Sequence, residues 1–270
     1  MGEVIVITSG KGGVGKTTTS ANLGCGLAIA GKNVVLIDAD IGLRNLDVVL
    51  GLENRIVYDL VDVVEGKCRL KQALVKDRRY EQNGGSLHLL STSQTKDKSA
   101  VSPEQMIKLC DTLREEFEYI IIDCPAGIEQ GFKNAIAGAD KAIVVATPEM
   151  SSVRDADRIV GLLEAAEIGD IRLILNRLRP DMMKRGDMLG IEDVTDVLAI
   201  DVLGLVPDDE SVITTTNRGE PAVAEQNSKA GQAFRDVTQR IMGNDVPFAN
   251  LEEETGGLGA WLRKIFKIGN

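Results

Sequence analysis

The stretch SGKGGVGKTT, residues 9–18, constrains this chain more than any other part of its sequence. It contains the pattern G-x-x-x-x-G-K-T, which begins at Gly10 and ends with Lys16 and Thr17. The apolar run VIVIT at 4–8 precedes the pattern, and a stretch rich in Ala and Leu follows it. A strand, a glycine-rich loop and a helix in this order are the context in which such a pattern predicts a phosphate-binding loop.

The residue types in this loop suit the oxygen atoms of a nucleotide. Glycines let the backbone wrap an anion with its N–H groups directed at oxygen, and the dipole of the following helix adds attraction. We expect Lys16 to reach the β- and γ-phosphates and the Thr17 hydroxyl to ligate Mg²⁺. A glycine-rich turn without a ligand is the alternative, which the flanking strand and helix disfavour. The predicted phosphate contacts are Gly10, Lys11, Gly12, Gly13, Val14, Gly15, Lys16, Thr17 and Thr18.

The composition is that of an ordinary globular protein and favours one large α/β domain. The chain has 270 residues, of which 43% are apolar and 27% charged. Aromatic residues make up only 3%, so Val, Ile, Leu and Ala must build the core, as in a parallel sheet buried on both faces. Because phosphate binding by a protein surface rests on clustered Lys and Arg, the net charge of −10 predicts no specific nucleic-acid partner.

The cysteines and the hydropathy pattern indicate a cytoplasmic protein. The sequence has no C-x-x-C pair and no signal peptide, so we expect reduced thiols rather than disulfides or a metal site. No stretch approaches the ~20 apolar residues that a membrane span needs. The cysteines concerned are Cys25, Cys68, Cys110 and Cys124.

Further apolar runs alternate with helical patterns along the chain. This alternation predicts a doubly wound, mostly parallel sheet flanked by helices in a single domain at 1–242, with the ligand at the carboxyl ends of the strands. Ser102 and Pro103 predict the start of a helix, with Ser as N-cap and a Gln three residues later. His88, the only histidine, lies in a short predicted strand and is interpreted as structural. The principal predicted strands are 33–38, 119–123, 141–147, 171–176 and 202–207.

Three aspartates occur where predicted strands end. Asp38 closes the run NVVLID, Asp40 follows it, and Asp123 ends the run YIIID. Hydrated Mg²⁺ binds proteins through one or two acids plus waters, so carboxylates at strand ends near a phosphate loop suit this ion. Solvated loop acids are the alternative, since most aspartates lie at the surface. We expect the Thr17 hydroxyl to bind the metal directly and Asp123 to hold it through water.

The motif GKGGVGKTT at 10–18 resembles the deviant Walker A motif of the ParA/MinD family of ATPases. In that family an early lysine reaches across a dimer to the nucleotide of the partner. Lys11 matches this lysine, and the resemblance therefore implies that Lys11 and Lys16 both take part in hydrolysis. A solvated lysine that adds general attraction for anions is the alternative for Lys11.

Two other stretches resemble the switch segments of the same family. DADIGLRNLD at 38–47 resembles switch I, and DCPAG at 123–127 resembles switch II. The resemblance implies that Asp40 orients the attacking water, that Asp38 supports the metal through water and holds the switch, and that Asn45 lies close to the phosphates. It also implies that Gly127 turns its N–H group toward the γ-phosphate.

The identity of the base is inferred from two later segments. A guanine-specific N-K-x-D motif is absent, because Asn176 is followed by Arg, Leu and Arg. Asn176 fits the adenine-contacting asparagine of the family, and the loop VPDD resembles the other wall of that pocket with Pro207 and Asp209. ATP is therefore favoured over GTP, with Mg²⁺ as the second cofactor.

The segment EMSSVRDAD at 149–157 resembles the family surface that lies along the dimer edge and recruits regulators. Glu149 corresponds to a contact across the dimer near the nucleotide. A capped and solvated start of a helix is the alternative reading. The candidate partner-binding residues are Ser151, Arg154, Asp155 and Asp157.

The last part of the chain has an amphipathic pattern. Residues 243–256 are predicted to form an acidic flexible linker, and 257–268 a helix with one apolar stripe and flanking cations. This pattern indicates an interfacial helix on anionic lipid. A last helix docked on the domain and a helix that binds a partner protein remain alternatives. The predicted membrane contacts are Leu258, Trp261, Leu262, Arg263, Lys264, Ile265, Phe266 and Lys267.

Taken over the whole chain, the resemblance is to the septum-site determining members of the ParA/MinD family. It implies a slow, partner-stimulated ATPase that dimerises with ATP on the inner face of the cell membrane. It also implies recruitment of a MinC-like inhibitor of FtsZ assembly and control by a MinE-like or topological regulator. A ParA-type partition ATPase, a flagellar-positioning ATPase, a metabolic enzyme or iron protein on the same fold and a nucleotide-gated scaffold are the alternatives.

Overall fold

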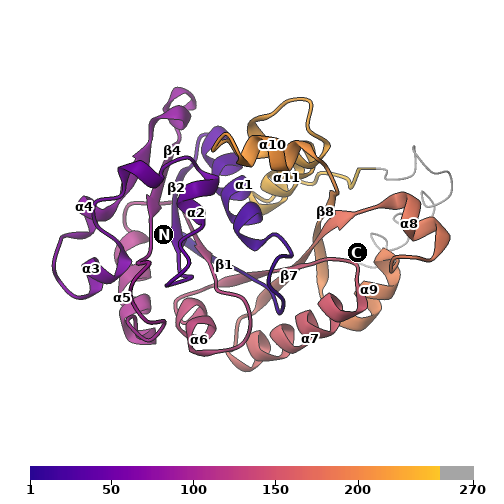
Figure 1. Cartoon of the computed structure of the whole chain (residues 1–270), viewed down its shortest axis with the longest axis horizontal. Helices are drawn as coiled ribbons and strands as arrows, with labels where there is room; N and C mark the ends of the chain where they lie inside the picture. The colour runs from indigo at the N-terminus through magenta and orange to yellow at the C-terminus, as the bar shows by residue number, and fades with distance from the viewer. Residues whose placement is uncertain (250–270) are drawn as a thin grey trace.

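The computed structural model describes residues 1–249, with Gln82 and Asn83 described by their backbone alone. Eight strands form one sheet in the order β3-β4-β2-β5-β1-β6-β7-β8 (Figure 1). The short β3 is antiparallel to β4, and the other neighbouring strands are parallel, which confirms the predicted fold class. The strands are β1 (Glu3–Thr8), β2 (Asn33–Asp38), β3 (Val75–Asp77), β4 (Ser86–Leu90), β5 (Tyr119–Asp123), β6 (Lys141–Ala146), β7 (Asp170–Leu178) and β8 (Asp201–Pro207).

Helices cover both faces of the sheet (Figure 1). In the described part of the chain they are α1 (Lys16–Ile29), α2 (Leu46–Val49), α3 (Leu60–Val64), α4 (Leu70–Ala73), α5 (Pro103–Leu113), α6 (Gln130–Ile136), α7 (Met150–Ala165), α8 (Pro180–Arg185), α9 (Ile191–Leu198), α10 (Ser211–Thr216) and α11 (Lys229–Ile241). Short 3₁₀ turns lie at Glu53–Arg55, Arg78–Asn83 and Ala222–Ala224. The predicted start of α5 is confirmed, because the Ser102 hydroxyl accepts the N–H of Gln105 and the Gln105 side chain accepts the N–H of Ser102.

The central strands are apolar on both sides because each side of the sheet meets its own layer of helices. Side chains alternate along a strand, so Val4 and Val6 of β1 enter one core and Ile5 and Ile7 enter the other. The first core packs against α5, α6, α7 and α9, and the second against α1, α2 and α11. With aromatic residues so few, Val, Ile and Leu supply most of both cores, as the composition predicts.

Helix α1 lies close to its neighbours because glycines interrupt its surface. A β-carbon on Gly26 would stand 2.4 Å from the hydroxyl oxygen of Thr238 on α11. That hydroxyl donates a hydrogen bond to the carbonyl of Phe234, which limits how far it can move. The glycine therefore sets the distance between α1 and α11 on one face of the sheet, and α1 begins at the end of the phosphate loop.

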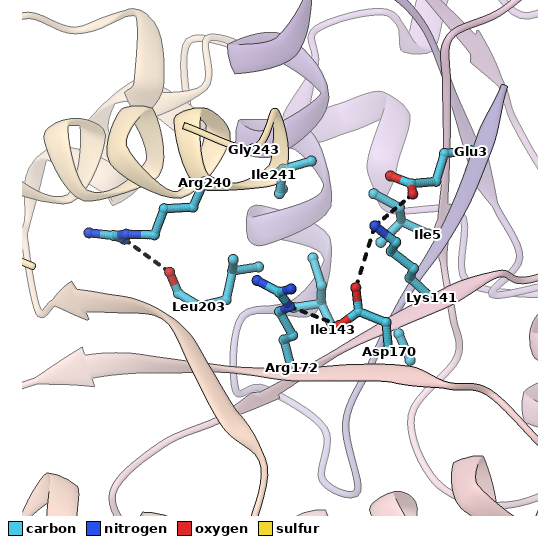
Figure 2. Close-up of a pocket in the computed structure, with 11 residues that line it drawn as sticks. Glu3, Ile5, Lys141, Ile143, Asp170, Arg172, Leu203, Arg240, Ile241 and Gly243 are labelled. Atoms are coloured by element: carbon cyan, nitrogen blue, oxygen red, sulfur yellow. Dashed lines mark hydrogen bonds and ion pairs between the residues drawn. The ribbon is translucent and has the colours of Figure 1, made fainter. Parts of the chain in front are cut away.

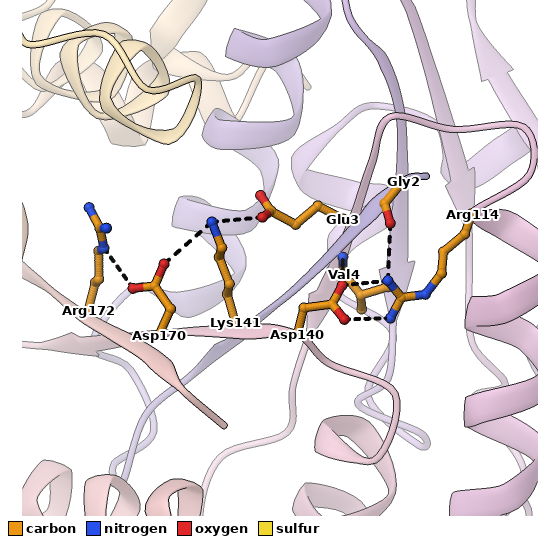
Figure 3. A network of polar contacts seen from close by, with 8 residues as sticks. All are labelled: Gly2, Glu3, Val4, Arg114, Asp140, Lys141, Asp170 and Arg172. Carbon is orange, nitrogen blue, oxygen red and sulfur yellow. Dashed lines mark hydrogen bonds and ion pairs between the residues drawn. The ribbon is translucent and has the colours of Figure 1, made fainter. Parts of the chain in front are cut away.

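Charged residues tie the amino ends of the strands together, at the edge opposite the phosphate loop. The Lys141 ammonium pairs with Glu3 at 2.7 Å and with Asp170 at 3.4 Å, and Arg172 donates to Asp170 at 2.8 Å (Figure 3). Nearby, Asp140 accepts the N–H of Val4 and the guanidinium of Arg114. These contacts link the ends of β1, β6 and β7.

A small cleft of about 140 Å³ opens at this same edge, beside the end of α11 (Figure 2). Arg240 on its rim donates hydrogen bonds to the carbonyls of Leu203, Val246 and Pro247, and its guanidinium lies 4.1 Å from the ring centre of Phe248. The first residues of the predicted linker are therefore held against the domain by Arg240.

The predicted amphipathic helix at 257–268, and the linker from residue 250 onward, lie outside the described residues. Within residues 1–249, no helix is long and apolar enough to cross a bilayer.

Two glycine substitutions test the packing of α1. Gly26→Ala should destabilise the protein by about 1–3 kcal/mol, because its new methyl group would overlap the Thr238 hydroxyl. Gly161→Ala is the matched control within α7, since a β-carbon there meets no atom within 4 Å. It should stabilise the protein by about 0.5–1 kcal/mol through helix propensity. Urea unfolding measures both, and equal shifts of the two midpoints would contradict this account.

Candidate nucleotide-binding site

The phosphate loop joins β1 to α1 at the carboxyl edge of the sheet, with β5 and β6 on either side of β1. Gly13 and Gly15 have φ angles of 79° and 102°, which side chains with a β-carbon rarely adopt. A β-carbon on Gly15 would also lie 2.3 Å from Nδ2 of Asn176. On Gly10 it would lie 2.2 Å from the carbonyl oxygen of Asp155 on α7. These glycines are required by the shape of the loop and by its neighbours.

The first turns of α1 meet the end of β5 through Asp123. The Thr17 hydroxyl donates to Oδ2 of Asp123 at 2.7 Å, and the Ser20 hydroxyl donates to Oδ1 at 2.8 Å. Lys16 lies between the loop and the sheet and is only 8% exposed. The structure therefore brings together Lys16, Thr17 and Asp123, as the sequence predicts.

Asp38 and Asp40 lie on the neighbouring strand end. Asp38 stands beside Asp123 in the register of β2 with β5 and is buried. Its carboxylate accepts the N–H groups of Asp40 at 3.0 Å and Leu46 at 3.2 Å, so it holds the start of the switch I segment. Oδ1 of Asp40 is buried, and the described residues offer it no hydrogen-bond partner.

The electrostatics of these acids fit a cation. Burial raises the pKa of Asp38, and the neighbouring charge of Asp123 raises it further. Burial also raises the pKa of Asp123, although hydrogen bonds from Thr17 and Ser20 and the charge of Lys16 oppose the rise. Two buried carboxylates side by side disfavour their own ionisation, and a divalent cation reverses that effect. Together with the Thr17 hydroxyl, they are the hard oxygen ligands that Mg²⁺ prefers.

Lys11 points away from the buried acids in this single chain. Its ammonium lies 3.5 Å from Oε2 of Glu149 and 3.1 Å from the hydroxyl of Ser151, at the start of α7. The pair of Lys11 with Glu149 is solvent-exposed, with 43% and 59% of the two side chains accessible. Exposed pairs of this kind contribute only about 0–1 kcal/mol, so Lys11 can leave Glu149 at little cost.

The other switch residues lie around the same edge of the sheet. The N–H of Gly127 donates to the carbonyl of Ser9 at 3.4 Å, and its φ of 89° requires glycine. Asn45 is exposed directly before α2 and precedes Leu46, whose N–H binds Asp38. Contacts of Gly127 and Asn45 with a phosphate stay predictions.

The residues predicted to contact the base make hydrogen bonds within the protein. Nδ2 of Asn176 donates to the carbonyl of Val14 at 2.8 Å, so this buried asparagine supports the phosphate loop from the end of β7. Asp209 accepts the N–H groups of Ser211 and Ala230. Although burial opposes it, these hydrogen bonds lower the pKa of Asp209 to about 2. Asp209 therefore anchors the loop that follows Pro207 at the end of β8.

The predicted partner surface lies on the exposed side of α7. Ser151, Arg154 and Asp157 are exposed, while Val153, Ala156 and Val160 face the core. Asp155 is half-buried because its backbone carbonyl packs against Gly10 of the phosphate loop. The candidate residues thus share one face that begins beside the nucleotide site.

Comparison with known proteins agrees with this geometry. The family model described as the CobQ/CobB/MinD/ParA nucleotide binding domain matches residues 5–222. The chain belongs to this family. It is 58% identical over 269 residues to the septum site-determining protein MinD of Bacillus subtilis, which covers 99% of each sequence. The resemblance to MinD sequences is therefore confirmed.

Two solved MinD structures share the fold. The MinC:MinD cell division protein complex of Aquifex aeolicus gives a TM-score of 0.84 at 48% identity, over 92% of this chain and 98% of that chain. MinD of Pyrococcus horikoshii complexed with Mg-ADP gives a TM-score of 0.79 at 30% identity, over 89% of this chain and 96% of that chain. Proteins of the MinD/ParA group are P-loop ATPases.

Ser20 lies at this site through its hydrogen bond to Asp123 and was not among the residues predicted from the sequence. It lies four residues after Lys16 on α1, so the two share one face of the helix. The spacing of one helical turn behind the lysine is a signal that could have found it. The partner, Asp123, is 103 residues away in sequence, which only the folded chain reveals.

Substitution of Asn176 distinguishes two roles of this residue, support of the phosphate loop and contact with the adenine base. Asn176→Ala leaves the buried Val14 carbonyl without its hydrogen-bond donor, which raises the free energy of the folded phosphate loop by about 1–3 kcal/mol. Affinity for ATP and for GTP should therefore both fall by about tenfold, and a contact with adenine would add a further loss for ATP alone. Titration with fluorescent analogues of both nucleotides measures this. Unchanged affinity for both would refute the supporting role.

Proposed function

We propose that this chain is a Mg²⁺-dependent ATPase that dimerises when it binds ATP and, on the inner face of the cell membrane, helps to position the division septum. The observation that carries the proposal is the convergence of Lys16, Thr17, Asp38, Asp40 and Asp123 at one edge of the sheet. Identity of 58% to a septum site-determining protein supports septum positioning over the partition and flagellar alternatives.

Hydrolysis in such a site depends on positioning and charge rather than on covalent chemistry. Lys16 would bind the β- and γ-phosphate oxygens from the buried side of the loop. Asp40, with its unpartnered Oδ1, would hold the attacking water and accept a hydrogen bond from it. Thr17 would hold Mg²⁺ directly, and Asp38 and Asp123 through water. The ion, when bound, would neutralise charge on the phosphate oxygens.

Dimerisation would supply the part of the site that one chain lacks. Lys11 lies on Glu149 and Ser151 of its own chain, at the exposed rim of the site. In the proposed dimer it leaves these weak contacts and reaches the nucleotide of the partner, much as an arginine finger does. A monomer would then hydrolyse ATP slowly, because the extra positive charge is present only in the dimer.

The proposed partners are a MinC-like inhibitor of FtsZ assembly and a MinE-like or topological regulator. The Aquifex aeolicus relative was solved in a MinC:MinD complex, and this chain is 48% identical to it. The candidate surface is the exposed face of α7 with Ser151, Arg154, Asp155 and Asp157. Because α7 packs on Gly10 through Asp155, the binding of a partner to α7 would depend on the position of the phosphate loop.

Membrane association is assigned to the C-terminal tail, with its apolar stripe and its flanking cations. One short interfacial helix should bind weakly, because its ordering offsets much of the gain from burying apolar side chains. Two tails on one dimer should bind about 10²–10⁴-fold better through avidity. The nucleotide would in this way control how long the protein stays on anionic lipid.

Two lysine substitutions test the division of roles in the loop. Lys16→Ala should weaken ATP binding by about 10–100-fold, because charge-assisted contacts to the phosphates are lost. Lys11→Ala should bind ATP with nearly unchanged affinity and fail to form the ATP dimer. Nucleotide titration and analytical ultracentrifugation with ATP and Mg²⁺ measure the two effects. If Lys11→Ala forms ATP dimers like the unmodified chain, the proposed role of Lys11 across the dimer interface is wrong.

Truncation tests the membrane role of the tail. A chain that ends at Gly257 should lose ATP-dependent sedimentation with anionic vesicles while keeping ATP-dependent dimerisation. The full chain with ADP serves as the control and should bind vesicles weakly, because a monomer has one tail. Continued vesicle binding by the truncated chain, or equal binding of the full chain with ADP and ATP, would contradict the proposal.

A further inference from the structure

The short helices α2 and α10 both begin at residues of the candidate nucleotide site. The N–H of Leu46, the first residue of α2, donates to the Asp38 carboxylate at 3.2 Å. The N–H of Ser211, the first residue of α10, donates to the Asp209 carboxylate at 2.8 Å. Asp38 is expected beside the metal and Asp209 beside the base. One helix therefore starts near the expected phosphates and the other near the expected base.

The segments that follow these two helices touch each other. Leu50 and Gly51 follow α2, and α10 runs into a turn in which the N–H of Gly219 donates to the carbonyl of Thr216 at 2.9 Å. Gly51 and Gly219 have φ angles of 64° and 70°. A β-carbon on Gly219 would stand 2.5 Å from Cα of Gly51. The two backbones are therefore in direct contact, and a side chain at Gly219 would separate them.

The guanidinium of Arg79 bridges the same two segments. It donates hydrogen bonds to the carbonyl of Leu50 and, at 2.8 Å, to the carbonyl of Gly219. Hydrogen bonds from a charged donor are stronger than those between neutral groups. Leu50 is the C-cap of α2, where unpaired carbonyls and the helix dipole favour a cation. Arg79 thus closes the contact between the end of α2 and the turn after α10.

Asp77 holds Arg79 in the orientation that both contacts need. Nε of Arg79 lies 3.0 Å from each carboxylate oxygen of Asp77, and Nη2 donates to Oδ2 at 2.6 Å. The Asp77 side chain is buried at the end of β3, whereas 39% of the Arg79 side chain is exposed. A forked pair of this kind fixes the plane of the guanidinium. The remaining N–H groups of Arg79 are therefore directed at the two carbonyls by the fold.

The turn at Gly219 is the better anchored of the two segments. Asp209 also accepts the Ser228 hydroxyl and the N–H of Ala230, both at 3.0 Å, at the start of α11. Helix α11 packs on the second core, so α10 is tied to a long helix. Helix α2 has only four residues, and a single turn has little stability of its own. Its position depends on Asp38 at its start and on Arg79 at its end.

Helix α2 overlaps the switch I segment at 38–47, which carries Asp40 and Asn45. In the proposed function this segment serves the steps that need the γ-phosphate, namely dimerisation and hydrolysis. Binding of ADP needs the phosphate loop and the base contacts instead. If the end of α2 were released from Arg79, the γ-phosphate steps should therefore suffer while binding of ADP should not.

We propose that Arg79 is a positioning residue for switch I, which holds the end of α2 against the anchored turn at Gly219 and so keeps Asp40 and Asn45 in place for the reaction of ATP. The inference rests on the proposed function of switch I. It assigns a role to a side chain that lies outside the phosphate loop and outside both switch segments.

Arg79→Lys in the full chain tests the proposal without leaving the buried Asp77 unpaired. Lysine keeps the charge beside Asp77, but its compact ammonium lacks the fork that reaches both carbonyls. The value of kcat for ATP should fall about tenfold, the ratio that corresponds to the loss of one charge-assisted hydrogen bond, and the ATP dimer should weaken by about the same factor. Affinity for Mg-ADP should stay unchanged. Phosphate release with anionic vesicles, sedimentation with ATP and titration with fluorescent ADP measure the three quantities.

Gly219→Ala separates the same two segments without changing Arg79. Its β-carbon would overlap Cα of Gly51, so kcat and ATP-dependent dimerisation should fall again while affinity for Mg-ADP is kept. Gly186→Ala, at the end of α8, is the matched control. Gly186 has a φ of 74°, close to that of Gly219, but a β-carbon there meets no atom within 4 Å. This control should hydrolyse ATP like the unmodified chain.

The outcomes distinguish this inference from the proposed function. If the unmodified chain hydrolyses ATP and kcat is unchanged in both Arg79→Lys and Gly219→Ala, the role of Arg79 alone is overturned. An equal loss of ADP affinity and of kcat also overturns it, because the whole site has then changed. An equal loss of kcat in Gly186→Ala does so too, since backbone strain would explain the effect. If the unmodified chain neither dimerises with ATP nor hydrolyses it, the proposed function is wrong and the inference with it.

Discussion

The carboxylate of Asp123 is the point on which the rest of the site depends. It is buried at the end of β5 and receives hydroxyl hydrogen bonds from Thr17 and Ser20, two residues of the first turns of α1. The buried Asp38 stands beside it in register on β2. Hydroxyl donors satisfy the oxygens of Asp123 and the charge of Lys16 favours its ionised form, but the two adjacent buried carboxylates still disfavour each other's ionisation. The fold therefore maintains a site that a divalent cation and its nucleotide would stabilise.

The surroundings of this site connect segments that are far apart in sequence. Asp38 binds the start of switch I, Asn176 supports Val14 of the phosphate loop from β7, and α7 packs against Gly10 through Asp155. A movement of the phosphate loop would therefore alter contacts on both halves of the sheet and at α7. This connection gives a physical route by which a bound nucleotide could affect a dimer partner or a regulator, as proposed. The amino edge of the sheet, with Lys141 and Arg240, is separate from it.

Most of the fold and the centre of the site could be predicted from the sequence, because their signals are local. The phosphate loop has its glycines, lysine and threonine within nine residues, and the three strands β1, β2 and β5 are apolar runs that end at Thr8, Asp38 and Asp123. In parallel sheets such ends meet at one edge, which is why Asp38 and Asp123 were expected to lie together. The start of α5 was predictable for the same reason, since its capping residues are adjacent in sequence.

The sequence by itself thus determined the layered α/β architecture, the phosphate loop and the acids beside it, since spacing and hydrophobic period act over a few residues. Only the tertiary structure decided which distant side chains meet. It paired Ser20 with Asp123, held the Lys11 ammonium on Glu149 and Ser151, and placed residues 246–248 against Arg240. Such pairs join residues up to 140 positions apart or depend on how a segment folds back, and no local pattern encodes them.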